Sequence, residues 1–524
     1  MNQPPANPSP QVGKWLITAS VMIPTMIEIL DTSVANVSLT HIQGSLSAGQ
    51  EEVTWVLTSY LVANAVVIPM SGWLARLLGR KRYLLASLVV FTLSSLLCGT
   101  ATSLDQLIFF RILQGVGGGG LQPMCTAILL ETFPPHERGL AMAIYGMGAT
   151  TGPILGPLLG GYLTDNLSWR WIFYVNLPIG LLALFMNQSF IHDPPYLQRW
   201  KKGEEVDYMG LALLCLGVGC LQIVLDKGQQ EDWFSSDFIL ILTLISALCL
   251  IGLVFWELGH KQPVLDLRIF GNRGFAAGNM VMFLGFFAFF GSIVLLPIFL
   301  QTLMGYTAFH AGLVLGPAGA ISLLMLPLIG KLTQKLDARL ILGAGLVTSA
   351  YSLYYMSGFN LSIDFFTAVL ARVIQGAGMP MFFVSLSFLT MAYVTREQMN
   401  NASAIFNLIR NLGGSFGVAF VTTFLARRAQ FHQARLVEHI HVYNPGYTLS
   451  LDELKTALSL KLGAFTDQTH AAAYLIYGRL RREAAVLAFN DAFYIQAWLF
   501  LGLILFLWMM RRPPAMKDAP PGAH

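Results

Sequence analysis

The sequence predicts an all-α protein that crosses a membrane many times and is built from two related halves. Of the 524 residues, 55% are hydrophobic and only 11% are charged. Apolar runs of about 20 residues, the length of a membrane-spanning helix, recur along the chain. In addition, the segment RILQGVG at 111–117 returns as RVIQGAG at 372–378, and each copy lies inside an apolar run.

The apolar runs predict fourteen membrane spans. We place them at residues 15–38, 53–75, 83–101, 106–131, 139–163, 170–190, 208–226, 237–258, 275–303, 309–331, 339–358, 366–393, 400–425 and 491–510. Because this number is even, both termini are expected on the same side of the membrane.

The basic residues predict which side that is. If the termini are cytoplasmic, the short loops on the opposite side contain only Arg170 and Lys227, and most other Lys and Arg residues fall in cytoplasmic segments. The positive-inside rule then indicates a multi-pass protein of the cell inner membrane with both termini in the cytoplasm. The net charge of +4 is too small to suggest a nucleic-acid partner.

A second repeated segment supports the duplication. The sequence GWLARLLGRK at 72–81 closes span two, and GKLTQKLDAR at 330–339 closes span ten. Spans two and ten have the same orientation, so the halves are parallel repeats with two spans inserted between them. The predicted organisation is a cytoplasmic tail (1–14), an N-terminal six-helix bundle (15–190), a linker with two inserted transmembrane helices (191–274), a C-terminal six-helix bundle (275–511) that includes a periplasmic loop (427–490), and a cytoplasmic tail (512–524).

Span one carries the chemistry that we expect to couple transport to protons. Glu28 and Asp31 are three residues apart and share a helical face inside an apolar run. Two carboxylates in a poorly solvated site compete for a proton, and Arg111 supplies the opposing charge. Asp31 has an alternative role as a packing hydrogen bond with Thr32 or Asn36, and Glu28 has one in selecting substrate charge.

The second half offers no matching carboxylate for Arg372, so we expect a structural or anion-facing role for this residue. Arg410 would suit acidic substrates if it faces a cavity, although a structural arginine is an equal alternative. Phe286 and Phe290 share a face of span nine and would line an apolar site, or else face lipid or core. The predicted substrate-binding residues are Thr32, Asn36, Gln114, Phe286, Phe290, Asn407, Arg410 and Asn411.

Glycine and proline mark the segments that we expect to change conformation. The series GPILGPLLGG at 152–161 removes side chains and backbone donors, which permits close helix approach and a kink. Tight packing without a moving role is the alternative. The residues assigned to conformational motifs are Gly72, Gly79, Arg80, Gly152, Pro153, Gly156, Pro157, Gly160 and Gly161. The five cysteines form no CxxC pair, and we expect neither a metal nor a cofactor.

The long segment before the last span contains helical patterns. The sequence SLDE at 450–453 has the form of a capping box, and a second helical stretch runs from about His470 to Ala488. On the predicted orientation, both lie outside the cytoplasm.

These motifs, taken in order, resemble the major facilitator superfamily and, within it, the fourteen-span drug:proton antiporters of the EmrB and QacA type. The resemblance covers almost the whole chain. It rests on LDTSVANV (30–37), the loop 72–81, the Arg111 motif, the series 152–161, WRWIF (169–173), and LDKG (225–228) followed by DWFSS (232–236). One departure is Arg76, which stands where the family usually carries an aspartate, so a charge relay through that loop is in doubt.

The resemblance implies an exporter of small lipophilic drugs or toxic compounds that is driven by the proton gradient and contributes to antibiotic resistance. It also implies that a periplasmic membrane-fusion adaptor and an outer-membrane channel complete a tripartite pump. The resemblance independently assigns Asp31 and Arg111 to coupling. A dedicated exporter of an endogenous metabolite such as a siderophore is the alternative, and a membrane-embedded receptor or enzyme is a remote one.

Overall fold

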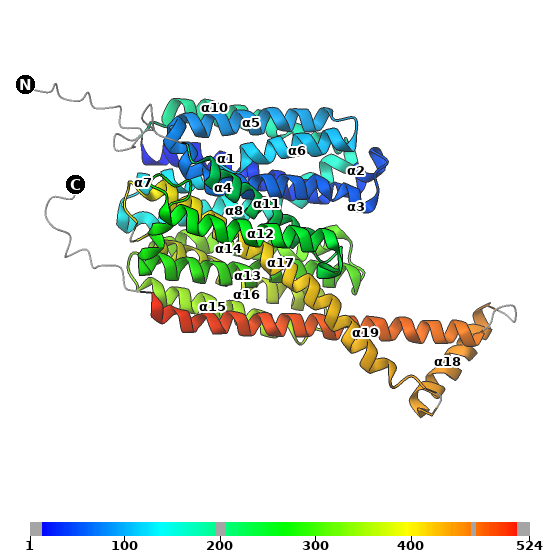
Figure 1. Ribbon diagram of the computed structural model, residues 1–524. Helices are drawn as coiled ribbons and strands as arrows, with labels where there is room; N and C mark the ends of the chain where they lie inside the picture. Colours follow the sequence, from blue (N-terminus) through cyan, green and yellow to red (C-terminus); the bar gives the residue numbers. More distant parts are fainter. Residues whose placement is uncertain (1–12, 194–205, 393, 442, 463–467, 511–524) are drawn as a thin grey trace, which may run out of the picture.

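The computed structural model describes residues 13–193, 206–392, 394–441, 443–462 and 468–510, and in this part of the chain it is a bundle of long helices without strands (Figure 1). Eleven helical segments are long and apolar enough to cross a membrane. Three more cross the bundle beside them, namely the pair α6 and α7, α8, and α15. The predicted all-α architecture with fourteen passes is therefore confirmed.

The first half contains six passes, which are α1 (Lys14–Val37), α4 (Trp55–Leu78), α5 (Arg80–Thr100), α6 (Leu104–Gly118) with α7 (Leu121–Thr132), α8 (Arg138–Asn166), and α9 (Trp171–Tyr174) with α10 (Asn176–Phe190). The short helices α2 (Leu39–Ser45) and α3 (Gln50–Val53) connect α1 to α4. The break between α6 and α7 coincides with a run of glycines. A Cβ on Gly119 would lie 2.7 Å from the Asn64 carbonyl oxygen, so the glycines let this pass lie directly against α4.

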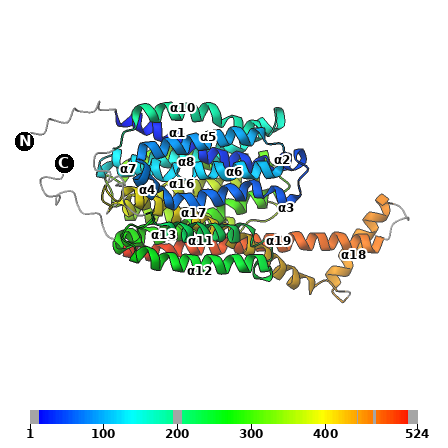
Figure 2. The ribbon, with the colours of Figure 1, turned by 45° about the horizontal axis from the view of Figure 1, so that its top comes forward.

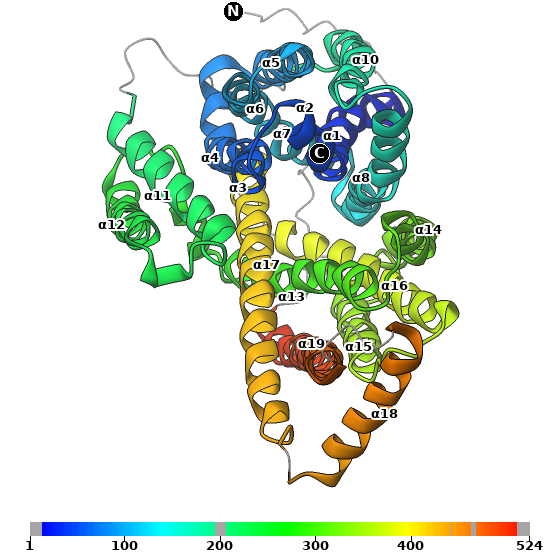
Figure 3. The ribbon, with the colours of Figure 1, turned by 90° about the vertical axis from the view of Figure 1, so that its right-hand side faces the viewer.

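Two inserted passes, α11 (Tyr208–Lys227) and α12 (Asp237–Gly259), form a hairpin beside the bundle (Figure 3). The second half contains α13 (Arg273–Thr302), α14 (Ala308–Leu332), α15 (Ala338–Met356), α16 (Phe365–Met391), α17 (Met399–Val437) and α19 (Gln468–Gly502). Side-chain caps fix several helix starts: Asp207 accepts from the Gly210 amide at 2.8 Å, and Asn272 accepts from the Gly274 amide at 3.0 Å.

The two halves meet at the end of the bundle where α1 begins and α19 ends, which we call the terminal end. The Arg138 Nη1 donates to the Met391 carbonyl at 2.9 Å, and a Cβ on Gly330 would lie 2.8 Å from the Ala143 Cβ. On the same face of α14, but nearer the opposite end, Gly312 and Gly316 meet no atom within 4 Å. The halves are thus in direct contact at the terminal end, and we call the opposite end of the bundle the far end.

Two helices of the second half continue beyond the bundle at the far end (Figures 1 and 2). Helix α17 runs past the predicted span to Val437, α19 begins at Gln468, and α18 (Pro445–Leu462) joins them. We call this part the projection. Asp491 of α19 holds its base together, since it accepts from the Arg428 Nε at 2.6 Å and contacts the His432 Nε2 at 2.7 Å.

Candidate functional site

Asp31 and Arg111 form a buried ion pair inside the first half. The Arg111 Nη1 lies 2.7 Å from the Asp31 Oδ2 and also donates to the Gln114 Oε1 at 2.8 Å. The Gln114 Nε2 and the Asn176 Nδ2 both donate to the Asp31 Oδ1, at 2.9 Å and 2.7 Å. Asp31 therefore accepts three hydrogen bonds, from α6 and α10. The predicted proximity of the span-one aspartate and the span-four arginine is seen in the geometry.

This pair is closed off from solvent in the present conformation. Arg111 is fully buried, its Nε donates to the Val56 carbonyl at 3.1 Å, and its guanidinium lies 4.2 Å from the centre of the Tyr60 ring. A buried pair with all of these partners is stable as two charges, whereas removing either charge leaves the other one uncompensated. Gln114, which the sequence assigned to substrate binding, forms hydrogen bonds with both members of the pair.

Glu28 occupies a different environment, although it lies on the same face of α1. Its Oε1 accepts from the Asn64 Nδ2 of α4 at 2.9 Å. Its Oε2 is buried and has no hydrogen-bond partner at normal distance among the described residues, although the Gln122 side chain acts on the carboxylate as a donor. Glu28 is 97% buried, and the Arg410 guanidinium of the second half acts on it electrostatically. It is therefore a buried carboxylate near the boundary between the halves.

Arg410 connects the two halves. Its Nη1 donates to the Tyr145 hydroxyl of α8 at 2.9 Å, and its Nη2 donates to the Gln122 Oε1 of α7. The Tyr145 hydroxyl donates to the same Gln122 oxygen at 3.0 Å, and Asn407 of α17 lies 3.5 Å from that hydroxyl. We call Glu28, Asn64, Gln122, Tyr145 and Arg410 the central polar cluster.

The central polar cluster answers the question that the sequence left open for Arg410. This arginine is neither capped by carbonyl groups nor open to a cavity, because 93% of its surface is buried and its partners are side chains of the opposite half. Any movement that separates α17 from α7 and α8 must break these contacts. The cluster is therefore placed to sense whether the halves are together or apart.

Arg372 has no carboxylate partner among the described residues. Its Nη1 donates to the Gln375 Oε1, and the Gln375 Nε2 donates to the Ser292 Oγ at 2.6 Å. Salt bridges in the described part of the chain do not include Arg372, in line with the sequence expectation for this half.

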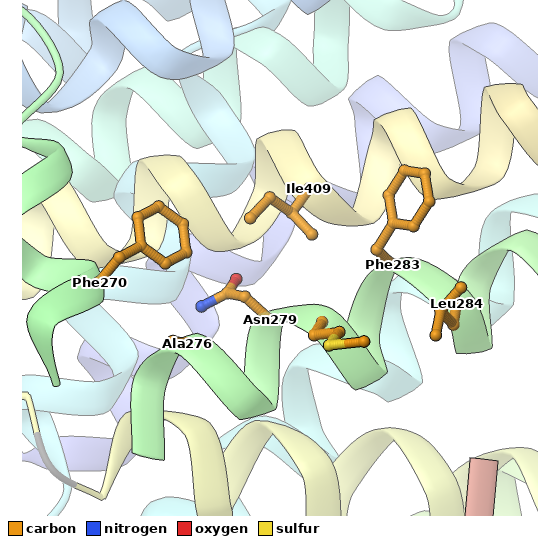
Figure 4. Close-up of a pocket in the computed structure, with 7 residues that line it drawn as sticks. Phe270, Ala276, Asn279, Phe283, Leu284 and Ile409 are labelled. Carbon is orange, nitrogen blue, oxygen red and sulfur yellow. The ribbon is translucent and has the colours of Figure 1, made fainter. Parts of the chain in front are cut away.

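The phenylalanines of α13 divide between a buried cluster and a groove. Phe286 is 4% exposed, and its ring centre lies 5.7 Å from that of Phe290 and 6.0 Å from that of Phe383. Phe290 is 38% exposed. Phe283 instead points into an apolar groove between α13 and α17, where Asn279 is the single polar lining residue (Figure 4). This groove is separate from the central polar cluster and contains none of the predicted substrate residues.

The remaining predicted substrate residues lie at mixed depths. Thr32 is partly buried, and its hydroxyl donates to the Glu28 carbonyl at 3.2 Å within the same helix. Asn36 is exposed near the far end of α1. Asn407 is fully buried and donates to the Ser403 carbonyl at 2.9 Å, while Asn411 is partly buried.

The glycine series of α8 packs against the helix that carries Glu28 and Asp31. A Cβ on Gly152 would lie 3.1 Å from the backbone of Ile29, and one on Gly156 would lie 3.2 Å from the backbone of Ser33. Gly160 faces Val34 in the same way, whereas Gly161 meets nothing within 4 Å. The predicted close approach is present for three of these glycines. The side chains of Pro153 and Pro157 lie outside the described part of the structure.

The basic motif at the terminal end also forms specific contacts. Gly79 has a φ of 88°, which a residue with a side chain adopts only with strain, and it turns the chain between α4 and α5. The two Nη atoms of Arg80 bind the Glu131 carboxylate of α7 at 2.7 Å each. A Cβ on Gly72 would lie 3.2 Å from the Asn401 Cα of the second half, so this glycine lies at the boundary between the halves.

Sequence reasoning missed several members of the two networks, namely Tyr60, Asn64, Gln122, Tyr145 and Asn176. Each is a polar or amphipathic residue inside an apolar span, and that placement was the available signal, because buried polar groups in membranes need partners. Their pairing could not be read from the sequence, because it depends on which helices face one another.

The bundle with a parallel repeat and intramembrane charges defines a secondary transporter. The sequence profile of the Major Facilitator Superfamily matches residues 21–425, and the chain belongs to this family.

Several proteins similar to this chain are named as export or resistance proteins. The multidrug export protein EmrB of Haemophilus influenzae is 36% identical over 508 residues, which is 95% of this chain and 96% of that protein. The fatty acid resistance protein FarB of Neisseria gonorrhoeae is 35% identical over 497 residues, which is 95% of this chain and 96% of that protein.

Solved structures confirm the fold. The human organic anion transporter MFSD10 superimposes with a TM-score of 0.60 at 14% identity, covering 95% of this chain and all of that chain. The proton:xylose symporter XylE superimposes with a TM-score of 0.60 at 15% identity, covering 94% of this chain and 95% of that chain.

Proposed function

We propose that the protein is a proton-coupled antiporter that exports lipophilic drugs or toxic compounds across the inner membrane, with Glu28 as the group that exchanges the proton. The export class is supported by the relatives that are named for multidrug export and fatty acid resistance. The coupling is supported by one observation above all: Glu28 is a buried carboxylate near the boundary between the halves, and an arginine of the other half acts on it.

Asp31 is the weaker candidate for proton exchange. Protonating it would disrupt a three-donor arrangement and leave Arg111 as a buried cation without its counterion. Breaking a buried pair in this way costs about 3–5 kcal/mol. We therefore assign Asp31 and Arg111 to a fixed charge pair that positions α1, and we assign the exchange step to Glu28.

The exchange follows from the position of the central polar cluster. With the terminal end closed, Arg410 is bound to Gln122 and Tyr145 and acts on the Glu28 carboxylate. Protonation from the far end removes the negative charge, which weakens the attraction that holds Arg410 and α17 against the first half. The halves can then part at the terminal end, where the proton leaves and substrate enters. The deprotonated transporter then carries the substrate to the far end. Each cycle therefore exchanges a proton for a substrate molecule.

The orientation and the partners belong to the same proposal. The distribution of basic residues supports a cytoplasmic location for the terminal end. The projection then extends on the periplasmic side, and it exposes apolar side chains such as Tyr474 (76%) and Leu449 (65%) in a region beyond the bundle. We assign this surface to a membrane-fusion adaptor that leads to an outer-membrane channel.

Inside-out vesicles that contain a proton gradient test the coupling. Addition of a lipophilic substrate should discharge the gradient with the wild-type protein and with Glu51→Gln, a control on the exposed helix α3. Glu28→Gln should abolish the discharge although the protein is present and folded. If Glu28→Gln discharges the gradient as the wild type does, the assignment of Glu28 is wrong.

A further inference from the structure

The second half contains an arginine and a glutamine that are arranged for a carboxylate but have none. In the first half, Gln114 accepts from Arg111 through its oxygen and donates through its nitrogen to Asp31. In the second half, Gln375 accepts from Arg372 through its oxygen and donates through its nitrogen to Ser292. The two amides are therefore oriented in the same way.

The repeat identifies the missing group. The step from Arg111 to Arg372 is 261 residues, and the same step leads from Asp31 to Ser292. The Ser292 hydroxyl takes the hydrogen bond from Gln375 at 2.6 Å and donates its own hydrogen to the Phe289 carbonyl at 2.7 Å. It cannot neutralise a cation.

The Arg372 guanidinium is therefore a buried charge without a counterion in the described part of the chain. It is 8% exposed, whereas Arg111 is fully buried. Burial is the one influence on its charge, and no acidic side chain contributes. A buried unpaired charge is costly in a membrane protein, and such residues commonly mark ligand pathways. The planar guanidinium fork matches a carboxylate in particular.

We propose that Arg372, Gln375 and Ser292 form a subsite for the carboxylate of an amphipathic ligand. The ligand carboxylate takes the place that Asp31 occupies in the first half and pairs with Arg372. Phe289 lies one turn before Ser292 on the same helix, its ring centre is 6.1 Å from that of Phe286 and 6.0 Å from that of Phe290, and it offers an apolar surface for the rest of the ligand. The proposal rests on the proposed export function and adds to it a class of substrate, the lipophilic carboxylates.

Supplying the missing carboxylate from the protein tests the subsite. Ser292→Asp should pair with Arg372 and exclude the ligand, so binding of decanoate to the purified full-length protein should weaken at least about 10-fold. Ser292→Ala removes the hydroxyl without adding charge and should keep decanoate binding within about 3-fold. Decanol, which has the same chain without the charge, should bind equally well to all three proteins. Thermal melting confirms that each variant is folded.

A second variant covers the case in which Ser292→Asp fails to fold. Arg372→Gln removes the cation and should weaken decanoate binding by a similar factor while leaving decanol unaffected. Unchanged decanoate binding in either folded variant would overturn the subsite. The subsite would also be wrong if chloride competed with decanoate while decanoate binding was insensitive to both variants.

Transport of a lipophilic cation in the same vesicles separates this result from the proposed function. If the wild type does not transport the cation in exchange for protons, the export proposal is wrong. If transport is normal and the Ser292 and Arg372 variants handle decanoate as the wild type does, only the subsite is wrong.

Discussion

The two halves of the bundle repeat one arrangement of arginine and glutamine but differ in what completes it. In the first half, Asp31 closes the arrangement and gives a buried ion pair at 2.7 Å. In the second half, Ser292 stands at the corresponding position, and Arg372 has no counterion among the described residues. The same scaffold thus holds a permanent charge pair on one side and an unpaired cation on the other.

The difference extends to the boundary between the halves. The step of 261 residues leads from Glu28 to Phe289 and from Gln122 to Phe383, so polar residues of the first half correspond to aromatic residues of the second. Tyr145 stacks on Phe383 at 6.1 Å, which places the polar and aromatic surfaces side by side. In the proposed function, the polar half handles protons and the aromatic half binds apolar ligands.

The largest effect should come from converting the first half into the second. Asp31→Ser leaves Arg111 buried without its counterion, which we expect to cost about 3–5 kcal/mol of the free energy of unfolding. Arg372→Gln in the second half removes a charge that has no partner, and it should change stability by less than about 1 kcal/mol. Unfolding in a denaturing detergent measures both. Equal losses in the two variants would contradict the comparison.

A second effect is expected at the contact that joins the halves. Arg410→Gln removes two charge-assisted hydrogen bonds to the first half, each worth about 1.5–3 kcal/mol at most. The terminal end should therefore open in a larger fraction of molecules. Distances between spin labels at the exposed positions Leu78 and Leu336 report this opening. A distance distribution identical to that of the wild type would show that Arg410 does not hold the halves together.

The glycine series of α8 should show a graded effect on stability. A valine at Gly156 would collide with Ser33 of α1, and overpacking of this kind costs about 1–3 kcal/mol. Gly161→Val, on the same helix, meets no atom within 4 Å and should be close to neutral. Melting temperature and vesicle transport of the two variants test this pair. Similar behaviour of both would mean that the close α1–α8 contact is not required.

The sequence predicted the framework well because its signals are local. Apolar runs gave the spans, and the repeated arginine motif gave the two halves and the proximity of Arg111 to span one. The central polar cluster could not be predicted in the same way, since Gln122 and Arg410 lie 288 residues apart and meet across the two halves. Arg410 aligns with Ala149 in the repeat, so internal comparison gave no partner for it. The extension of α17 was missed because its last turns are polar, and polarity alone does not end a helix outside the membrane.

The central claim is that Glu28, and not the paired Asp31, gains and loses the transported proton. Difference infrared spectroscopy of the purified protein follows the carbonyl band of a protonated carboxyl group as the pH is changed. We predict a band that titrates in the wild type and in Asp31→Asn and is missing in Glu28→Gln. A titrating band that persists in Glu28→Gln and disappears in Asp31→Asn would contradict the account.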